Sequence, residues 1–442
     1  MIGLANHGLE AVRSVPGLYE DYLEGVGVCV NELNIYLGSK KLSAGAQPSL
    51  PDSDDDARQE NFIVDRNFIV AALARYAHEV LKSNEYYEAK YETEMLYVDY
   101  ANHRVLVRNK RTSEEEYLPY DLLVGADGVR STVREALVKR HFDFELSVSD
   151  IFQTFKAVHI KCPEDVCPTA LSIMPNCIPH FNGIVLPETG GLINLSMGTS
   201  RNNFDGNVDE DVKSDDAEVV CEYFKKAFKC FKLSEEGYMD LATQWVNQRW
   251  NRTGMVHCNK YSSSECKIVL LGDAAHATSP SIGMGMNTAL RDAQKLFELL
   301  DKFDDDLDKI LPEYSRIRVP EGNALSDLAL HLYCFDTKVT ARSMVKSLVR
   351  GGLNKLLPWL VDPDCQIYIG QKGYTLTDVY QKATEQGILK VHRATNERIR
   401  QEFFERQTGM IVDKPKSSFW KIPVVMSVMA AICGAVMKMK IW

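Results

Sequence analysis

The chain has 442 residues, of which 45% are hydrophobic, and a formal net charge of -10 at pH 7. Its length is sufficient for two or three lobes with cores of their own, and its acidic balance argues against a nucleic-acid groove, which needs a clustered basic face. The eleven cysteines show no CxxC spacing, which indicates reduced intracellular thiols, with neither a disulfide framework nor a metal site.

The first thirty residues show no leader and no nucleotide-binding loop. Residues 1–16 lack the charged region and apolar core of a signal peptide. Residues 8–15 are predicted to form a helix. Residues 25–30 are predicted to form a turn into a strand, because their glycine pair has no preceding strand and no third glycine. A strand, G-x-G-x-x-G loop and helix are therefore not found here.

The next predicted helix follows an acidic stretch at residues 48–59, which we interpret as a solvated loop. From residue 61 to residue 76 the pattern changes from extended to helical. Arg66 stands at the start of this helix. Two interpretations of it remain open: a surface ion pair, or a guanidinium that binds phosphate.

Two strands are predicted at residues 100–107 and 117–124, and the second leads into a polar motif. Gly125, Asp127 and Gly128 lie where this strand ends, and Ser131 is placed to cap the following helix. For Asp127 the sequence leaves two roles open, a helix cap and a direct contact with a ligand.

Residues 146–265 alternate in a way typical of extended structure and are predicted to form an inserted sheet. A helix is expected at residues 215–231. The apolar face of such a sheet is suited to line a binding pocket for a small molecule. The predicted strands are residues 154–160, 170–174, 183–186, 191–198 and 243–252.

The most informative stretch is residues 267–300. Ile268 to Leu271 is an apolar run typical of a buried parallel strand, and Gly272 and Asp273 follow at its carboxyl end, where open α/β sheets bind ligands. A helix is predicted from Asn287 to Leu300, with one apolar side formed by Leu290, Leu296, Phe297 and Leu300. The N–H groups and dipole at its start suit an electron-rich ligand.

Three of these strings resemble motifs of the class A FAD-dependent aromatic monooxygenases. The string G-D-A-A-H, with a later P and G-x-G-x-N, resembles their second FAD-binding motif, residues 125–134 resemble their D-G motif, and Arg66 lies in a similar R-x-x-L/I-x-x-x-L pattern. The resemblance implies these FAD-binding residues: Arg66, Gly125, Asp127, Gly128, Gly272, Asp273, Pro280, Gly283, Met284, Gly285, Met286 and Asn287.

The fold implied is α/β, with an FAD-binding Rossmann-type (GR2-like) lobe, an inserted mixed β-sheet substrate domain and a helical C-terminal region. The expected segments are 1–145 and 266–345 for the FAD-binding lobe, 146–265 for the substrate domain, 346–410 for the helical region and 411–442 for a tail. Because the N-terminal βαβ unit with its G-x-G-x-x-G loop is not found, we expect FAD to be held weakly by this chain of 442 residues.

Residues 318–333 are similar to a helix of the kynurenine 3-monooxygenases. The resemblance implies hydroxylation of a small aromatic substrate with NADPH or NADH and O2, through a flavin C4a-hydroperoxide. Leu332 stands where that family has an asparagine facing the substrate carboxylate, so Tyr333 or Arg342 would hold the carboxylate, or the substrate is not an amino acid. No catalytic side chain is assigned. The alternatives are a flavin reductase or epoxidase acting on a membrane lipid, and a cofactor-free remnant.

The last apolar segment, residues 422–437, is flanked by lysines and tryptophans at both ends. It is shorter than the roughly 20 residues of a typical span, but its flanks suit the two membrane interfaces. We expect a tail that attaches the protein to an intracellular membrane, the mitochondrial outer membrane by family resemblance. The alternative is a helix packed on the protein.

Overall fold

The computed structural model describes residues 1–43, 61–82, 84–252 and 254–409. The acidic stretch at 48–59 and the tail at 411–442 lie outside the described residues. The chain divides into two units, Met1–Ile399 and Arg400–Trp442. The elements below belong to the first unit, apart from the last turns of helix α12 (Ile388–Gln407), which fall in the second.

The N-terminal segment forms a small antiparallel sheet and a core of its own. Its strands, in spatial order, are β1 (Ile2–Leu4), β5 (Phe62–Val64) and β2 (Val28–Cys29). Its helices are α1 (Asn6–Arg13), η1 (Tyr19–Leu23) and α2 (Arg66–Val80). Leu9, Val12 and Ile69 are buried between these helices and the sheet. The helices predicted for residues 8–15 and after residue 61 are confirmed.

A three-stranded antiparallel sheet follows, with β6 (Thr93–Asp99), β7 (Arg104–Asn109) and β8 (Glu115–Pro119). The strands predicted at 100–107 and 117–124 are wrong in their limits. Residues 100–103 form the turn before β7, where His103 has a φ of 47°. Residues 120–122 separate β8 from β9 (Leu123–Gly125), and the backbone N–H of Tyr120 donates to His103 O beside the last β7–β8 pair.

The sheet that carries the glycine motifs has the order β16 (Ser262–Ser263), β17 (Ile268–Leu270) and β9. β17 is completely buried and pairs with β9 in parallel, as predicted for this apolar run. Helix α3 (Thr132–Arg140) follows β9, and α7 (Asp273–His276), η5 (Pro280–Ile282) and α8 (Gly285–Lys302) follow β17. The helix predicted at residues 287–300 is confirmed. Phe297 was predicted on its buried side, but it is 72% exposed.

The inserted region forms a mixed six-stranded sheet among the described residues. Its strands, in spatial order, are β11 (Gln153–Lys161), β14 (Leu192–Ser200), β13 (Phe181–Pro187), β12 (Ala170–Ile178), β3 (Glu32–Leu37) and β4 (Lys40–Ser43). β3 pairs with β12 in parallel, so a hairpin from the N-terminal segment completes this sheet. The other two strands of the region, β10 (Leu146–Asp150) and β15 (Gly254–Cys258), pair with each other.

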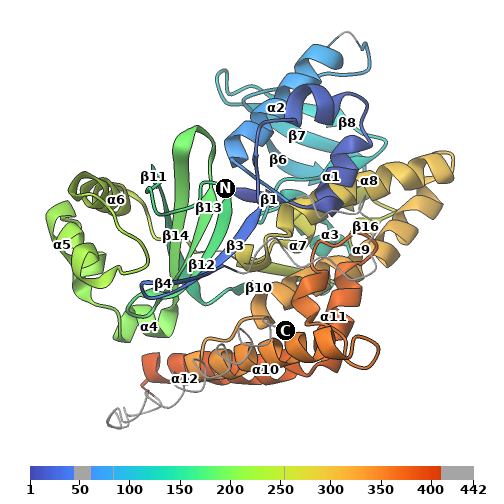
Figure 1. The fold of residues 1–442 in the computed structure, drawn as a ribbon. Helices are drawn as coiled ribbons and strands as arrows, with labels where there is room; N and C mark the ends of the chain where they lie inside the picture. The colour runs from blue at the N-terminus through green and yellow to red at the C-terminus, as the bar shows by residue number, and fades with distance from the viewer. Residues whose placement is uncertain (44–60, 83, 253, 410–442) are drawn as a thin grey trace. The chain divides into compact units, whose positions relative to one another are not determined.

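Helices α5 (Ala217–Ala227) and α6 (Glu235–Asn247) lie beside one face of this sheet (Figure 1). The strand predicted at residues 243–252 is wrong, since α6 extends to Asn247. Ser234 caps this helix, and Leu241 and Trp245, four residues apart, both point into the core. The indole N–H of Trp245 donates to Val212 O over 2.9 Å. The helix therefore gives this buried side chain, which the sequence pattern placed on a strand, a hydrogen-bond partner.

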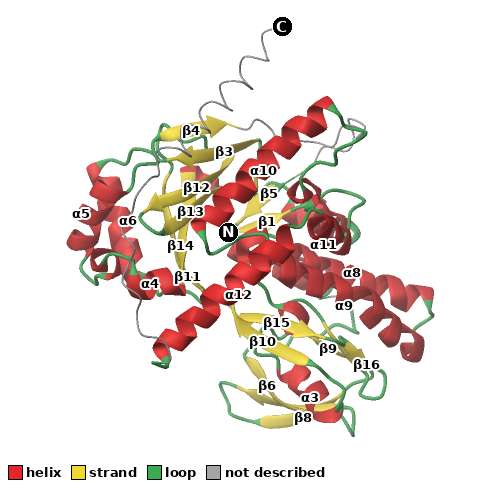
Figure 2. Ribbon diagram, turned by 90° about the horizontal axis from the view of Figure 1, so that it is seen from below, coloured by secondary structure: helices red, strands yellow, loops and turns green. Residues whose placement is uncertain are grey.

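The remaining helices of the C-terminal region are α9 (Leu307–His331), α10 (Thr337–Leu356) and α11 (Leu376–Glu385). α8 and α9 lie side by side (Figure 2). α9 contacts α11, and its buried Leu325 and Leu328 join Leu376 and Val379 in one apolar cluster. No helix within the described ranges has both the length and the apolar character required to cross a membrane.

Candidate functional site

The pairing of β9 with β17 brings the two glycine motifs to one edge of a sheet. Leu270 is the partner of Gly125, and the N–H of Leu271 donates to Gly125 O over 2.9 Å. Because the strands are parallel, Asp127 and Asp273 both follow the carboxyl ends of their strands. Gly125 has no room for a side chain, since an added Cβ would lie 2.8 Å from Val133 Cβ. The glycine therefore permits the close approach of α3.

Arg134 joins these two motifs by hydrogen bonds. Its side chain is buried, and its Nη1 donates to Ala274 O in α7 while its Nη2 donates to Val129 O, both over 2.7 Å. The guanidinium thus links the segment that follows β9 to helix α7, which follows β17. Arg134 is the last residue of the D-G motif. Nothing in the sequence indicated that its side chain would bind the carbonyl of Ala274.

Asp127 is held at the start of α3. Its Oδ2 accepts hydrogen bonds from the N–H groups of Thr132 and Val133, at 2.7 and 3.2 Å, and Ser131 caps the same helix through Arg134 N. The capping role of Ser131 is confirmed. The Asp127 side chain is exposed, and Gly128 beside it has a φ of 80° with open space around its Cα. The geometry gives Asp127 a capping role through Oδ2.

The turn after β17 depends on Gly272, which has a φ of 56°. This left-handed conformation strongly favours glycine, and an added Cβ would also lie 3.1 Å from Ala289 Cβ. The turn presents Asp273, the first residue of α7, as an exposed carboxylate. No described side chain forms an ion pair with Asp273.

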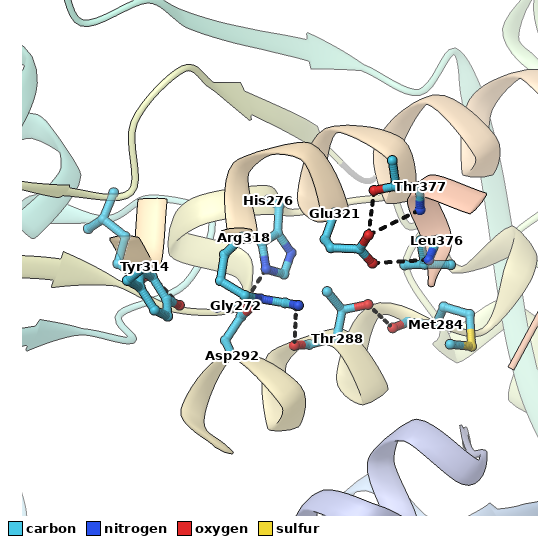
Figure 3. A network of polar contacts seen from close by, with 11 residues as sticks. Gly272, His276, Met284, Thr288, Asp292, Tyr314, Arg318, Glu321, Leu376 and Thr377 are labelled. Atoms are coloured by element: carbon cyan, nitrogen blue, oxygen red, sulfur yellow. Dashed lines mark hydrogen bonds and ion pairs between the residues drawn. The ribbon is translucent and has the colours of Figure 1, made fainter. Parts of the chain in front are cut away.

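A buried ionic network lies directly behind this turn (Figure 3). Asp292 in α8 is 0% exposed and accepts hydrogen bonds from Gly272 N at 2.9 Å, His276 Nε2 at 2.6 Å and Arg318 Nε at 2.7 Å. Burial by itself would raise the pKa of Asp292, but the charges and hydrogen bonds of His276 and Arg318 hold it below its ordinary value. The carboxylate is therefore an internal anion that fixes the Gly272 turn.

Helix α9 supports this network from the other side. Tyr314 donates to Leu270 O over 3.2 Å, and Arg318 also reaches Thr288 O at 3.4 Å. Gly322, one turn after Arg318, lies so close to Tyr261 and His276 that an added Cβ would be 2.1 Å from the Tyr261 hydroxyl. Asp292 and Arg318 have no role readable from the sequence, because their spacing shows only that both lie on helices.

Asn287 connects the second motif to the N-terminus of the chain. Its Oδ1 accepts from Ala5 N at 2.8 Å, and its Nδ2 donates to Gly3 O at 2.9 Å and Gly283 O at 3.1 Å. The side chain is completely buried, and Gly8 packs against it. The structure thus places Asn287 as a brace between the glycine loop and β1, with its amide groups occupied by backbone partners.

The other residues of the second motif surround this brace. Gly283 is exposed with a φ of 67° and open space around it, and Pro280 is exposed at the first position of η5. Gly285 begins α8. Met284 is buried in the cluster that contains Leu332, while Met286 packs against the N-terminal core.

Arg66 is the first residue of α2 and is exposed. Asp65 caps this helix by accepting from Asn67 N. Arg66 forms no ion pair with any residue that the structure describes, so the surface-pair interpretation finds no partner here. Val64 pairs with Ile2, and the neighbouring Gly3 lies near Gly283 O, so β1 separates the start of α2 from the glycine loop.

The residues considered for substrate binding occupy different environments. Leu332 is 3% exposed in the core around α9 and α11. Tyr333 is 40% exposed just after the end of α9, and Arg342 is exposed on α10. The structure therefore makes Leu332 a packing residue and leaves Tyr333 and Arg342 accessible.

A sequence profile described as "FAD binding domain" matches residues 77–329, more than half of the chain. The chain belongs to this family. Curated relatives include the violacein synthase of Chromobacterium violaceum, 27% identical over 70% of this chain and 69% of that protein. Kynurenine 3-monooxygenase of Sus scrofa is 32% identical over 48% of this chain and 43% of its own length. The enzyme of the same name from Neurospora crassa is 26% identical over 84% of this chain and 74% of its own length. The match to the Sus scrofa enzyme thus spans less than half of that relative.

Solved structures share the fold. A variant of 2-methyl-3-hydroxypyridine-5-carboxylic acid oxygenase superposes with a TM-score of 0.58 at 18% identity, covering 86% of this chain and 87% of that one. Pseudomonas aeruginosa PqsL in complex with 2-aminobenzoylacetate gives a TM-score of 0.55 at 19% identity, covering 75% and 84%. The predicted FAD-binding α/β fold and the resemblance to class A FAD-dependent aromatic monooxygenases are confirmed.

Residues of the matched FAD binding domain, together with Arg66 before it, fit the cofactor chemically. Glycines with positive φ at 272 and 283 keep the backbone bare, and the N-terminus of the 18-residue helix α8 follows them. Asp273 offers a carboxylate suited to polyol hydroxyls, and Arg66 a free guanidinium suited to phosphate. Asp273, Gly283 and Arg66 are exposed, while Gly272 and the network of Asp292 behind it are buried.

Proposed function

We propose that this protein is an FAD-dependent monooxygenase that hydroxylates a small aromatic substrate with NADPH or NADH and O2. One observation carries the proposal: β9 and β17 bring the D-G motif and the second FAD motif to the same sheet edge, with Asp127 and Asp273 exposed there. The relatives named kynurenine 3-monooxygenase support it, as does the complex of PqsL with the aromatic compound 2-aminobenzoylacetate.

The described residues have distinct tasks in this proposal. Asp273 accepts hydrogen bonds from cofactor hydroxyls, and the start of α8 beyond Gly283 stabilises negative charge on the flavin ring through its N–H groups. Arg66 binds a phosphate. Bound flavin supplies the redox chemistry that activates O2. The protein orients substrate and cofactor and excludes water from the reacting atoms.

The substrate is proposed to be aromatic and similar to kynurenine, with its polar groups held by residues other than Leu332. The face of the substrate sheet opposite α5 and α6 carries the half-buried side chains Ile35, Ile173 and Ile184. These positions alternate with buried residues along each strand, so they form an apolar surface suited to an aromatic ring. Tyr333 is the proposed polar contact near the end of α9.

The test is reconstitution of the full chain with FAD, followed by stopped-flow oxidation of NADPH and NADH with a panel of aromatic amino and keto acids, including kynurenine. The expected result is a bound-flavin absorption spectrum and a hydroxylated product containing one atom of labelled oxygen from O2. A bound flavin that oxidises the nicotinamide without product would reduce the proposal to a flavin reductase. Lack of flavin binding at saturating FAD would overturn it.

We also propose, from the sequence of residues 422–437, that the protein is attached to an intracellular membrane through this tail. A mitochondrial outer membrane location is proposed on the resemblance to kynurenine 3-monooxygenases alone. Imaging of the full chain tagged at its N-terminus tests both, and a diffuse signal would contradict them.

A further inference from the structure

Helix α10 has a charge that differs from that of the rest of the chain. Residues 337–361 contain five basic residues and no aspartate or glutamate, although the chain carries a net charge of -10. The basic residues are Lys338, Arg342, Lys346, Arg350 and Lys355. Such a segment in an acidic protein concentrates positive potential on one element.

Six exposed side chains of α10 form a stripe along the helix. At about 100° per residue, positions 338, 342, 346, 349, 353 and 356 fall within an arc of roughly 80°. The first three are basic and exposed. The last three are Val349, Leu353 and Leu356, which are 48%, 42% and 64% exposed. The stripe therefore changes from basic to apolar along the helix.

Two further exposed apolar residues follow the end of the helix in the sequence. Trp359 and Leu360 are 79% and 72% exposed, in a stretch where the backbone turns after Leu356. Isolated exposed apolar residues are common on soluble proteins, but three on one helical stripe, followed within four residues by two more, mark a candidate interaction site.

The basic half has no partners of its own. Lys338, Arg342 and Lys346 form no ion pair with any residue in the described part of the chain. Lysines on other helices do, for example Lys225 with Glu222 and Lys295 with Glu298. The charges on this stripe are therefore available to an external anion.

We propose that this stripe of α10 is a docking surface for a membrane rich in anionic phospholipids. Lys338, Arg342 and Lys346 contact the headgroups, and the apolar end at Trp359 and Leu360 enters the interfacial region. Tryptophan favours this boundary, where its ring is apolar and its N–H remains hydrated. The proposal concerns α10 and the residues directly after it, up to Leu360, and is independent of FAD binding and of residues 410–442.

An acidic protein is the competing partner, and the observations favour the membrane. A purely electrostatic partner explains the basic half only, whereas Trp359 and Leu360 need an apolar phase. The basic residues share one stripe of α10 with Val349, Leu353 and Leu356, so one flat surface can contact both kinds of side chain.

The experiment is co-sedimentation of the full chain with phosphatidylcholine vesicles that contain 0% or 30% phosphatidylserine. The variant Lys338→Glu/Arg342→Glu/Lys346→Glu is compared with the matched control Lys40→Glu/Lys110→Glu/Lys229→Glu, which alters three exposed lysines elsewhere. Each basic residue near an anionic surface contributes a factor of about five, so we expect the α10 variant to lose about 100-fold in affinity for the anionic vesicles. The control should lose less than about fivefold.

Residues 410–442 carry five lysines of their own, which every variant retains, so the measured quantity is the difference between each variant and the wild type in the increase caused by phosphatidylserine. Equal loss in the two triple variants would show that net charge alone is responsible and would overturn the proposal.

A second variant tests the apolar half. Leu356→Ser/Trp359→Ser should lose at least about tenfold in affinity for anionic vesicles and should bind a polyglutamate peptide as the wild type does. If polyglutamate competes with vesicles and the serine variant keeps full vesicle affinity, the surface serves an acidic protein and the proposal is wrong. Both halves are exposed, so unchanged circular dichroism spectra and melting curves confirm that each variant is folded.

Discussion

The carboxylate of Asp292 lies 2.9 Å from the backbone N of Gly272, so a buried anion on α8 fixes the turn that presents Asp273. Gly272 is held in a left-handed conformation at that point. The exposed carboxylate of Asp273, which is proposed to bind the cofactor, is therefore positioned by the carboxylate of Asp292, which is buried and cannot contact the cofactor. This relationship separates residues that contact FAD from residues that position them.

Asp273→Ala should weaken FAD binding by roughly ten- to hundredfold, because it removes a charge-assisted hydrogen bond worth about 1.5–3 kcal/mol. The melting temperature should not change, since Asp273 is exposed. Isothermal titration calorimetry with FAD measures the effect. Asp205→Ala, which removes an exposed aspartate from α4 (Arg201–Gly206), is the control. Equal FAD affinity in both variants would contradict the assignment of Asp273.

Asp292→Asn should destabilise the protein by about 3–5 kcal/mol, because it leaves Arg318 buried without its anion. Chemical denaturation measures the change. The double variant Asp292→Leu/Arg318→Met, which removes both charges, should recover a large part of the loss. A double variant less stable than Asp292→Asn would show that packing, and not an unpaired charge, dominates.

The same pair predicts a pH dependence. Burial opposes ionisation of Asp292, but His276 and Arg318 lower its pKa in the folded state below the ordinary value. Its stabilising effect is therefore complete above the unfolded pKa, near 4, and is lost as the pH falls through the lower folded pKa. We expect the stability difference between wild type and Asp292→Asn to be constant from pH 6 to pH 8 and to shrink below about pH 4. A stability difference between wild type and Asp292→Asn that grows below pH 4 would contradict a lowered pKa of Asp292 in the folded state.

Asp127→Asn separates the two roles left open for this residue. Asparagine keeps a side-chain oxygen for the N–H groups of Thr132 and Val133, so the cap of α3 should survive and the melting temperature should change little. If Asp127 also contacts cofactor hydroxyls, FAD affinity should fall by about tenfold. Calorimetric titration and a thermal melt of one sample give both values. Unchanged affinity would restrict Asp127 to capping.

Gly8→Ala should destabilise the protein by about 1–3 kcal/mol through overpacking. A Cβ at this position would lie 2.4 Å from Asn287 Oδ1 and 2.6 Å from Leu4 Cδ1. Gly351→Ala is the control, because that helical glycine has open space around it and alanine there should be neutral or stabilising by up to about 1 kcal/mol. Urea denaturation compares the two, and equal stability would show that α1 can move away from α8.

The sequence by itself determined the local features of this protein. The apolar run at Ile268, the glycine turn after it and the cap at Ser131 each depend on neighbouring residues, so their roles could be read in order along the chain. The FAD-binding family followed from the same strings, because each depends on backbone conformations that only certain residues adopt.

Only the tertiary structure decided which distant residues meet. Sequence periodicity gave Asp292 and Arg318 helical positions without indicating that they form one buried ion pair. It also assigned residues 243–252 to a strand, although Trp245 is buried on a helix against α5, and it did not show that β3 completes the substrate sheet. The physical reason is that burial, strand pairing and ion pairing are contacts between elements far apart in the chain, and short apolar runs satisfy them as either helix or strand.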